Sequence, residues 1–118
     1  MIVTDTGFHE DRPGTLWHDL DLDAPLPAPL PDAIRIPFAS FADGRGFTVA
    51  RRLRAAGYGG RLRAAGHLIA DQYAMARRSG FDEIELGDEI AARQPQAQWR
   101  ARSDWRAHDY QARLGRRG

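Results

Sequence analysis

The feature that most constrains the fold of this chain is the alternation of short strand-like and helix-like segments between residues 33 and 94. The strand-like segments alternate apolar with polar residues, whereas the helix-like segments place apolar residues three or four positions apart. The predicted strands are residues 33–38, 61–65 and 82–86, and the predicted helices are residues 44–56, 67–79 and 88–93. This order predicts an α/β domain built on a small βαβαβ sheet, with parallel strands and right-handed crossovers.

The ends of the first two helices carry start and stop signals. Asp43 precedes the first helix and is predicted to be its N-cap. The first helix is followed by Gly57-Tyr58 and the second by Gly80-Phe81, in each case a glycine and then an apolar residue, as glycine C-caps prefer. We therefore predict that these glycines end the two helices.

The two faces of the predicted sheet differ in their chemistry. One face holds apolar side chains, such as Ile34 and Leu62, which would meet the helices. The opposite face holds the charged residues Arg35, Arg63, Glu83 and Glu85. Such a face cannot be a dry core unless its charges pair, which favours a part-barrel-like sheet with helices outside and a polar inner face. The acidic N-terminal arm, the tryptophan-bearing C-terminus and a second subunit are three candidates for covering it.

Composition divides the chain into three parts. They are an acidic N-terminal arm with a proline-rich linker (1–32), the α/β core (33–94) and an arginine- and tryptophan-rich C-terminal tail, helical or irregular (95–118). Residues 1–43 hold two arginines and eight acidic residues, a net charge of −6, and residues 44–118 hold fifteen arginines and eight acidic residues, a net charge of +7. Every basic residue is arginine, so each cation can bind a carboxylate or an oxyanion through two parallel hydrogen bonds.

Composition also excludes several classes of chemistry. The chain has no cysteine, which excludes disulfides, thiol redox chemistry and cysteine-ligated metal clusters. Its four histidines have no paired spacing, and its glycines match neither a dinucleotide-binding nor a P-loop motif, so we predict no metal and no cofactor of its own. No apolar run is long enough to span a membrane, and the N-terminus lacks the layout of a signal peptide. We expect a cytoplasmic protein.

The carboxyl ends of the predicted strands gather residues that can bind ligands. The turn from Asp43 through Gly44 and Arg45 to Gly46 begins the first helix, where free N–H groups attract anions. The two glycines would let a ligand approach the backbone, and Arg45 would add a two-pronged donor. An anion-binding turn and an ordinary capped turn are both consistent with this sequence.

Other polar residues offer further candidates, each beside a structural alternative. Arg51 and Arg54 lie three positions apart on the first helix and would form either a solvated face or a docking patch for an acidic partner. His67 is a candidate acid or base that Asp71 could orient, or a structural histidine. Nucleic acid is not favoured as a ligand, because the core lacks the interleaved aromatic residues of RNA readers.

The segment from Phe38 to Phe81 resembles a bacterial family known as domain of unknown function 934. The similarity is carried by F-x-x-F-x-D-G-R-G-F-[ST]-x-A-R-x-L-R, G-[YF]-x-G-x-[LI]-R-A, D-Q and R-x-G-F-[DE]. The matching positions are Asp43, Gly44, Arg45, Gly46, Phe47, Arg51, Arg54, Arg63, Asp71, Gln72, Gly80 and Phe81. The resemblance assigns no catalytic role to any of them.

What the resemblance implies about function comes from gene neighbourhood. The family is often described as an oxidoreductase of sulfite reduction, because its genes tend to lie beside those for assimilatory sulfite reductase and phosphoadenylylsulfate reductase. We therefore expect an accessory protein of sulfate or sulfite assimilation that works with sulfite reductase or another protein of that pathway. Whether the chain is itself an enzyme is left open. The alternative is a small α/β enzyme or sensor that binds an oxyanion or phosphate at the Asp43–Gly46 turn.

The predicted sheet also bears on self-association. Three parallel strands leave two free edges and one charged face, and so small a sheet is marginally stable alone. We therefore predict a homo-oligomer, with a dimer as the simplest form.

Overall fold

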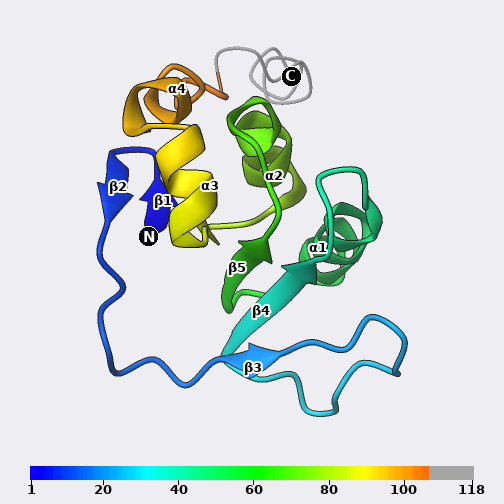
Figure 1. Ribbon diagram of the computed structural model, residues 1–118. Helices are drawn as coiled ribbons and strands as arrows, with labels where there is room; N and C mark the ends of the chain where they lie inside the picture. The colour runs from blue at the N-terminus through cyan, green and yellow to red at the C-terminus, as the bar shows by residue number, and fades with distance from the viewer. Residues whose placement is uncertain (107–118) are drawn as a thin grey trace.

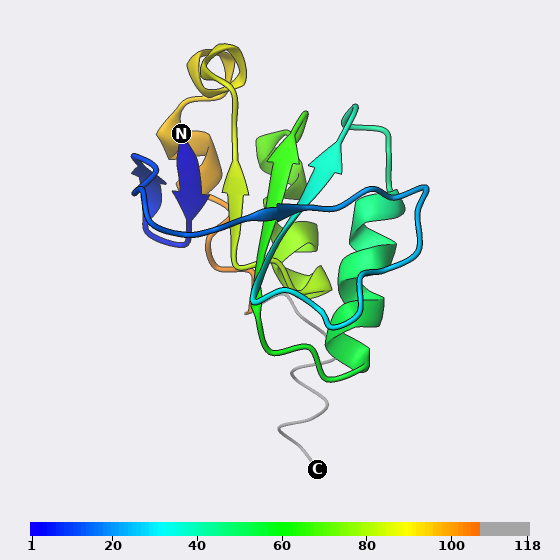
Figure 2. The same cartoon turned by 90° about the horizontal axis from the view of Figure 1, so that it is seen from below.

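A computed structural model describes residues 1–106 of the chain as one mixed α/β unit. The elements are β1 (Ile2–Thr4), β2 (Gly7–His9), β3 (His18–Asp19), β4 (Ala33–Phe38), α1 (Arg45–Ala55), β5 (Arg61–Gly66), the 3₁₀ turn η1 (Ala70–Gln72), α2 (Tyr73–Ser79), β6 (Glu83–Glu85), α3 (Asp88–Arg93) and α4 (Gln96–Arg100). They form a six-stranded sheet in the order β2-β1-β6-β5-β4-β3. Figure 1 labels β1 to β5 and the helices α1 to α4. Helices α1 and α2 lie on one side of this sheet, and the segment between β2 and β3 crosses the other side (Figure 2).

The centre of the sheet is the βαβαβ unit that the sequence predicts. Strands β4, β5 and β6 are parallel, with Ile36 beside Ala64 and Ala64 beside Ile84. These three side chains are fully buried beneath the helices, because alternate residues of each strand turn toward the same apolar face. The predicted fold class, an α/β domain with a parallel core, an N-terminal arm and a helical C-terminal part, is confirmed.

The two predicted helix stops are also confirmed. Gly57 and Gly80 have φ angles of +94° and +112°, in the left-handed region that side chains disfavour. The amide of Tyr58 donates to the carbonyl of Leu53 at 2.9 Å, which closes the last turn of α1 as a Schellman motif requires. Each glycine thereby returns the chain to the next strand.

The second helix is shorter than predicted. It was expected to begin at His67, whereas the structure has an extended residue at Ile69, the turn η1, and then α2 from Tyr73. The reason is that β5 continues to Gly66 in register with Phe38, and the amide of His67 still donates to the Phe38 carbonyl at 3.0 Å. The backbone is therefore held along the sheet when the predicted helix would already have begun.

The N-terminal arm is part of the sheet. β1 pairs antiparallel with β6 and with β2, so that Val3 lies beside Ile84 and joins the core. β3 pairs in parallel with β4 at the other edge, and Leu20, just after it, is also buried. The three parallel strands therefore have no free edge of their own, because the arm adds strands on both sides.

The C-terminal part contributes to the core as well. Trp99 of α4 is 1% exposed, packs against Tyr73 with ring centroids 6.3 Å apart, and donates its indole N–H to the Gln94 carbonyl at 2.8 Å. In the predicted tail, Trp99 and, in part, Trp105 thus pack on the body, while residues 107–118 lie outside the described residues. Within residues 1–106, no helix combines the length and the apolar character needed to cross a membrane.

Candidate functional site

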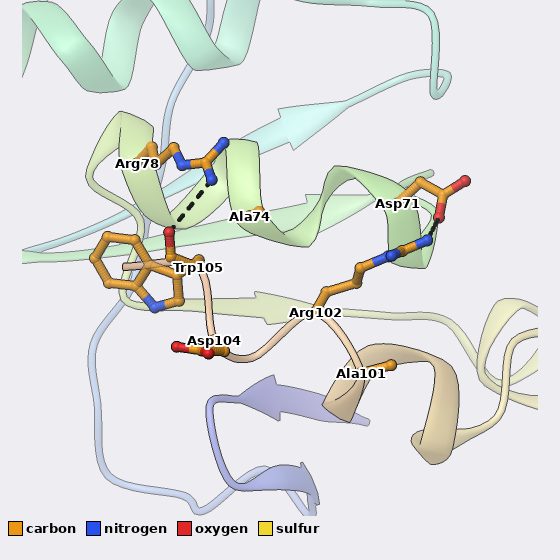
Figure 3. Close-up of a pocket in the computed structure, with 7 residues that line it drawn as sticks. All are labelled: Asp71, Ala74, Arg78, Ala101, Arg102, Asp104 and Trp105. Atoms are coloured by element: carbon orange, nitrogen blue, oxygen red, sulfur yellow. Dashed lines mark hydrogen bonds and ion pairs between the residues drawn. The ribbon is translucent and has the colours of Figure 1, made fainter. Parts of the chain in front are cut away.

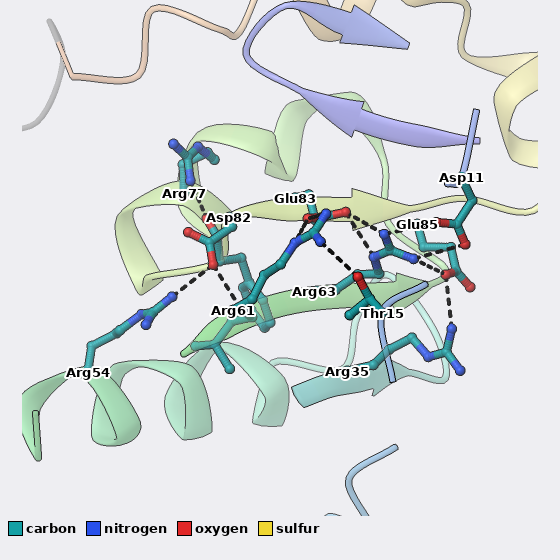
Figure 4. Close-up of polar contacts among 12 residues, drawn as sticks. Asp11, Thr15, Arg35, Arg54, Arg61, Arg63, Arg77, Asp82, Glu83 and Glu85 are labelled. Carbon is teal, nitrogen blue, oxygen red and sulfur yellow. Dashed lines mark hydrogen bonds and ion pairs between the residues drawn. The ribbon is translucent and has the colours of Figure 1, made fainter. Parts of the chain in front are cut away.

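The charged face of the sheet carries a ladder of side chains from three neighbouring strands. The register places Arg35 of β4 beside Arg63 of β5, and Arg63 beside Glu83 of β6. Glu85 follows two residues later on the same face (Figure 4). The prediction that these four residues share one face, and that their charges must pair, is confirmed.

Arg63 lies at the centre of the ladder and uses every N–H of its guanidinium. Its side chain is 2% exposed. Nε and Nη2 donate to Glu83 at 2.9 and 2.6 Å, and Nη1 donates to Glu85 at 2.8 Å. Asp11 accepts from Nη1 and from Nη2, both at 3.2 Å. Since a guanidinium has five N–H donors, these five bonds satisfy it completely.

Residues 10–17, which we call the covering segment, lie over this ladder. They bring Asp11 to Arg63, and the hydroxyl of Thr15 accepts a hydrogen bond from Arg61 at 3.3 Å. The guanidinium carbon of Arg63 lies 4.3 Å from the centroid of the Trp17 ring, a cation–π distance. The N-terminal arm, one of the three candidates, therefore covers the charged face.

The ion pairs continue to the rim of the ladder. Arg35 donates to Asp19 of β3 and, at 3.1 Å, to Glu85. Hydrogen bonds from Arg35 hold the pKa of Asp19 below its ordinary value, and those from Arg63 do the same for Asp11. The contact with Asp19 in turn raises the pKa of the Arg35 guanidinium. The arm is thus attached to the sheet by carboxylates in their charged form.

We expect acid to weaken this attachment. A carboxylate with a lowered folded-state pKa stabilises the fold above its unfolded pKa, about 3.9 for aspartate, and loses that contribution as pH falls through the lower folded value. The unfolding temperature, followed by circular dichroism between pH 6 and pH 2, should therefore fall less steeply below pH 4 in Asp19→Asn than in the unchanged chain. Asp21→Asn is the control, because the Asp21 carboxylate accepts its hydrogen bond from the backbone amide of Asp23 and not from an arginine. Parallel curves for Asp19→Asn and the unchanged chain would contradict the expectation.

A cavity of about 860 Å³ adjoins the ladder. It lies between the sheet and the covering segment, and its walls include Arg61, Arg63, Glu83, Glu10, Asp11 and Arg12. The cavity therefore opens onto the buried guanidinium of Arg63 from the side of the covering segment.

The Asp43–Gly46 turn has a different geometry from the predicted one. The helix begins at Arg45 with Gly44 as its N-cap, so the prediction that Asp43 is the N-cap is wrong by one position. The Asp43 carboxylate instead accepts from the backbone amide of Arg45 at 3.1 Å and from its guanidinium. Arg45 also donates to Asp23 at 3.2 Å and stays 58% exposed. The backbone N–H of Arg45, the first residue of α1, therefore already donates to a carboxylate of the same chain.

Gly46 has a packing role in this turn. A Cβ at this position would lie 2.5 Å from the ring of Phe38, whereas one at Gly44 would meet open space. Phe38 in turn packs on Phe47 and on Phe81, with ring centroids 4.8 and 5.8 Å apart. The motif glycine therefore lets α1 approach the aromatic core closely.

Arg54 and Arg51 do not act as a pair. Arg54 donates all five N–H groups, to the carbonyls of Gly80, Tyr58 and Gly60 and to Asp82, at 2.7 to 3.1 Å. It thus joins the ends of α1 and α2 to the strands that follow them. Arg51 is exposed on the outer side of α1. The predicted shared face is wrong, because the Arg54 side chain turns inward to satisfy loop carbonyls.

Asp71 and Gln72 begin the second helical segment. Gln72 accepts from the Ile69 amide at 3.0 Å and donates to the Phe41 carbonyl at 2.6 Å, which ties this helix start to the loop before α1. Asp71 forms an ion pair with Arg102 at 2.7 Å. His67 is exposed, and Asp71 is engaged elsewhere, so the predicted orientation of His67 by Asp71 is not formed.

A shallow pocket of about 300 Å³ lies beside that ion pair, between α2 and the C-terminal segment (Figure 3). Asp71 and Arg102 meet at one end, and at the other end Arg78 donates to the Trp105 carbonyl at 3.3 Å. Asp71, Arg102 and Arg78 are thus already engaged with partners of the same chain, which favours a structural junction between α2 and the C-terminal segment.

One polar cluster, centred on Asp5, is not predicted by any sequence pattern described above. Asp5, in the turn between β1 and β2, accepts from the Tyr73 hydroxyl, from Arg77 at 3.1 Å and from the Trp105 indole at 3.2 Å. Desolvation raises the pKa of Asp5, but these hydrogen bonds outweigh it and the net pKa is lowered. Burial and the bond to Asp5 raise the pKa of Tyr73. The cluster joins the first turn to α2 and to the C-terminal segment.

The predicted site residues are therefore in separate places. The Asp43–Gly46 turn and Gln72 lie together at the carboxyl edge of β4 and β5, whereas Arg63 lies within β5 on the charged face. Arg45 and Arg63 share no partner, so the Asp43–Gly46 turn and the charged face do not form one site. In the described part of the chain, no group of histidine, aspartate or glutamate side chains is arranged to hold a metal ion.

Comparison with known proteins gives one match. Residues 25–117 match the model of a family described as bacterial protein of unknown function, DUF934. No curated protein and no solved structure matches the chain. The matched residues include strands β4 to β6 and all of the motif positions, but not the covering segment.

Proposed function

We propose that this chain, which belongs to the DUF934 family of bacterial proteins, is an accessory protein of assimilatory sulfite reduction that acts by binding sulfite reductase or another protein of that pathway. The pathway in this proposal rests on the gene neighbourhood that the motif resemblance implies. The proposal that the chain acts by binding a partner rests on the outer side of α1. The two supports are independent, so each is tested separately below.

The observation that favours binding is the outer side of α1. Arg45, Arg51 and Arg52 are exposed and fall within about one third of the helix circumference at 100° per residue. The opposite side of α1 buries Phe47, Ala50 and Leu53 in the core. An exposed arginine surface on a rigid helix attracts and orients an acidic partner surface.

The test is growth and capture in a bacterium that carries this gene. We expect a deletion strain to need cysteine when sulfate is the sulfur source, and the unchanged chain to restore growth. The double variant Arg51→Glu, Arg52→Glu should fail to restore growth and should capture at least tenfold less partner protein, because two favourable charges become repulsive. Its melting temperature should stay close to that of the unchanged chain, since both side chains are exposed.

Arg93→Glu is the matched control. Arg93 is 75% exposed on α3 and pairs only with Glu89 among its described ion pairs, so an arginine-to-glutamate reversal, at one position rather than two, is made away from α1. It should restore growth fully. Growth of the deletion strain on sulfate at the unchanged rate would overturn the pathway assignment, and full activity of the double variant would overturn the role of α1.

The second candidate, an oxyanion site at the Asp43–Gly46 turn, has weaker support. An incoming anion must displace the Asp43 carboxylate from both the Arg45 amide and the Arg45 guanidinium. Self-association also stays a prediction, although the strand edges that motivated it are covered by β1 and β3.

A further inference from the structure

We propose that the charged face of the sheet is a carboxylate-binding site centred on Arg63, in which Asp11 of the covering segment occupies the place of the ligand. This site lies on the opposite side of the sheet from α1, and it goes beyond the proposed partner surface (Figure 2). It would take a single carboxylate, carried either by a small organic acid or by an acidic side chain of a peptide.

The first support is the inequality among the three carboxylates that Arg63 binds. Glu83 is 4% exposed and bonds Arg63 at 2.6 and 2.9 Å. Asp11 is 49% exposed, forms two 3.2 Å bonds and belongs to a loop outside the strand ladder. Asp11 is therefore the most readily exchanged partner, and its departure frees two parallel N–H groups, the arrangement that recognises a carboxylate.

The second support is charge. Without Asp11, the ladder and its ion-pair partners Arg61 and Asp19 together hold three arginines and three carboxylates, namely Arg35, Arg61, Arg63, Asp19, Glu83 and Glu85. One carboxylate restores the charge that the ladder has with Asp11 in place. A dianion such as sulfate would add one further negative charge beside Glu83 and Glu85, at a cost that grows in a poorly solvated site. The site therefore selects a monoanionic group.

The third support is space. The cavity of about 860 Å³ lies against Arg63, Arg61 and Asp11, so a ligand larger than one carboxylate has room beside the guanidinium. Arg63 and Arg61 lie within the residues that match the family model, and Asp11 lies outside them. The arginines that would bind the ligand thus belong to the matched core. Asp11, which occupies the place of the ligand, belongs to the N-terminal arm.

The test uses the full chain labelled with ¹⁵N at arginine, with the side-chain Nε–H signal of Arg63 followed by nuclear magnetic resonance. Three probes are titrated at constant ionic strength: acetate, the capped peptide Gly-Asp-Gly, and sulfate. In Asp11→Ala, we expect acetate or the peptide to shift the Arg63 signal saturably, with a dissociation constant at least tenfold lower than in the unchanged chain. The reason is that the substitution removes the Asp11 carboxylate, a competitor tethered to the same chain with an effective concentration of about millimolar.

Glu10→Ala is the control, because it removes the same charge from the wall of the same cavity without removing a bond to Arg63. It should leave the dissociation constants within twofold of the unchanged chain. Tighter binding of acetate than of the peptide assigns the site to small acids, and the reverse assigns it to acidic side chains. Equal gains in Glu10→Ala and Asp11→Ala, tighter binding of sulfate than of either carboxylate, or no saturable shift in Asp11→Ala would overturn the proposal.

Discussion

Replacement of Arg63 by methionine is expected to lower the free energy of unfolding by about 3–5 kcal/mol. The change leaves Glu83, which is 4% exposed, without its two bonds from Arg63. Glu83 then keeps only the half-exposed Arg61 as a partner, so the desolvation of its buried carboxylate is no longer fully offset. Urea unfolding at pH 7, followed by circular dichroism, measures the effect.

Arg61→Met provides the comparison. Arg61 also contacts Glu83 but is 47% exposed, so its loss should cost only about 1 kcal/mol or less. The double variant Arg63→Met, Glu83→Leu should recover much of the lost stability, since it also removes the buried carboxylate that has lost its main partner. Equal losses for the two single variants would contradict the view that Arg63 is the centre of the ladder.

Replacement of Trp99 by alanine should have an effect of similar size, about 3–5 kcal/mol. Trp99 is 1% exposed and packs on Tyr73, so alanine leaves a cavity in the core as well as an unpaired Gln94 carbonyl. The measurement is again urea unfolding, with the expectation of a lower midpoint and an unchanged slope.

Gln98→Ala is the control on the same helix. Gln98 is exposed, and its replacement should change the free energy of unfolding by less than about 0.5 kcal/mol. A Trp99→Ala variant as stable as this control would show that α4 contributes nothing to the folded core in solution.

Local sequence signals are sufficient to predict the parallel core. Alternation in β4 and β5 and the glycines at positions 57 and 80 each depend on a few neighbouring residues, so they can be read without knowledge of the fold. β1, with three residues, is too short for alternation to distinguish it from a loop. Its position is decided by the pairing of Val3 with Ile84, a contact between distant parts of the chain.

The same distinction applies to the candidate site. Alternation placed Arg63 on the charged face, and the acidity of the arm made it a candidate cover. Which acid meets Arg63 was not predictable, because Asp11 lies in a loop without periodicity. Two motif residues have structural roles: Gly46 lets α1 pack against Phe38, and Arg54 donates hydrogen bonds to loop carbonyls. A sequence pattern alone does not distinguish such roles from ligand binding.

The order of strands in the sheet has a consequence for the chain during synthesis. Among the strands of the described residues, β1 is made before the others, yet one of its two neighbours is β6, which is made after them. Until residues 83–85 emerge, Ile2 and Val3 cannot complete their place in the sheet, and their apolar side chains remain accessible to chaperones or to other nascent chains. The sheet therefore closes late and through contacts of high sequence separation, so folding should be slow for so short a chain.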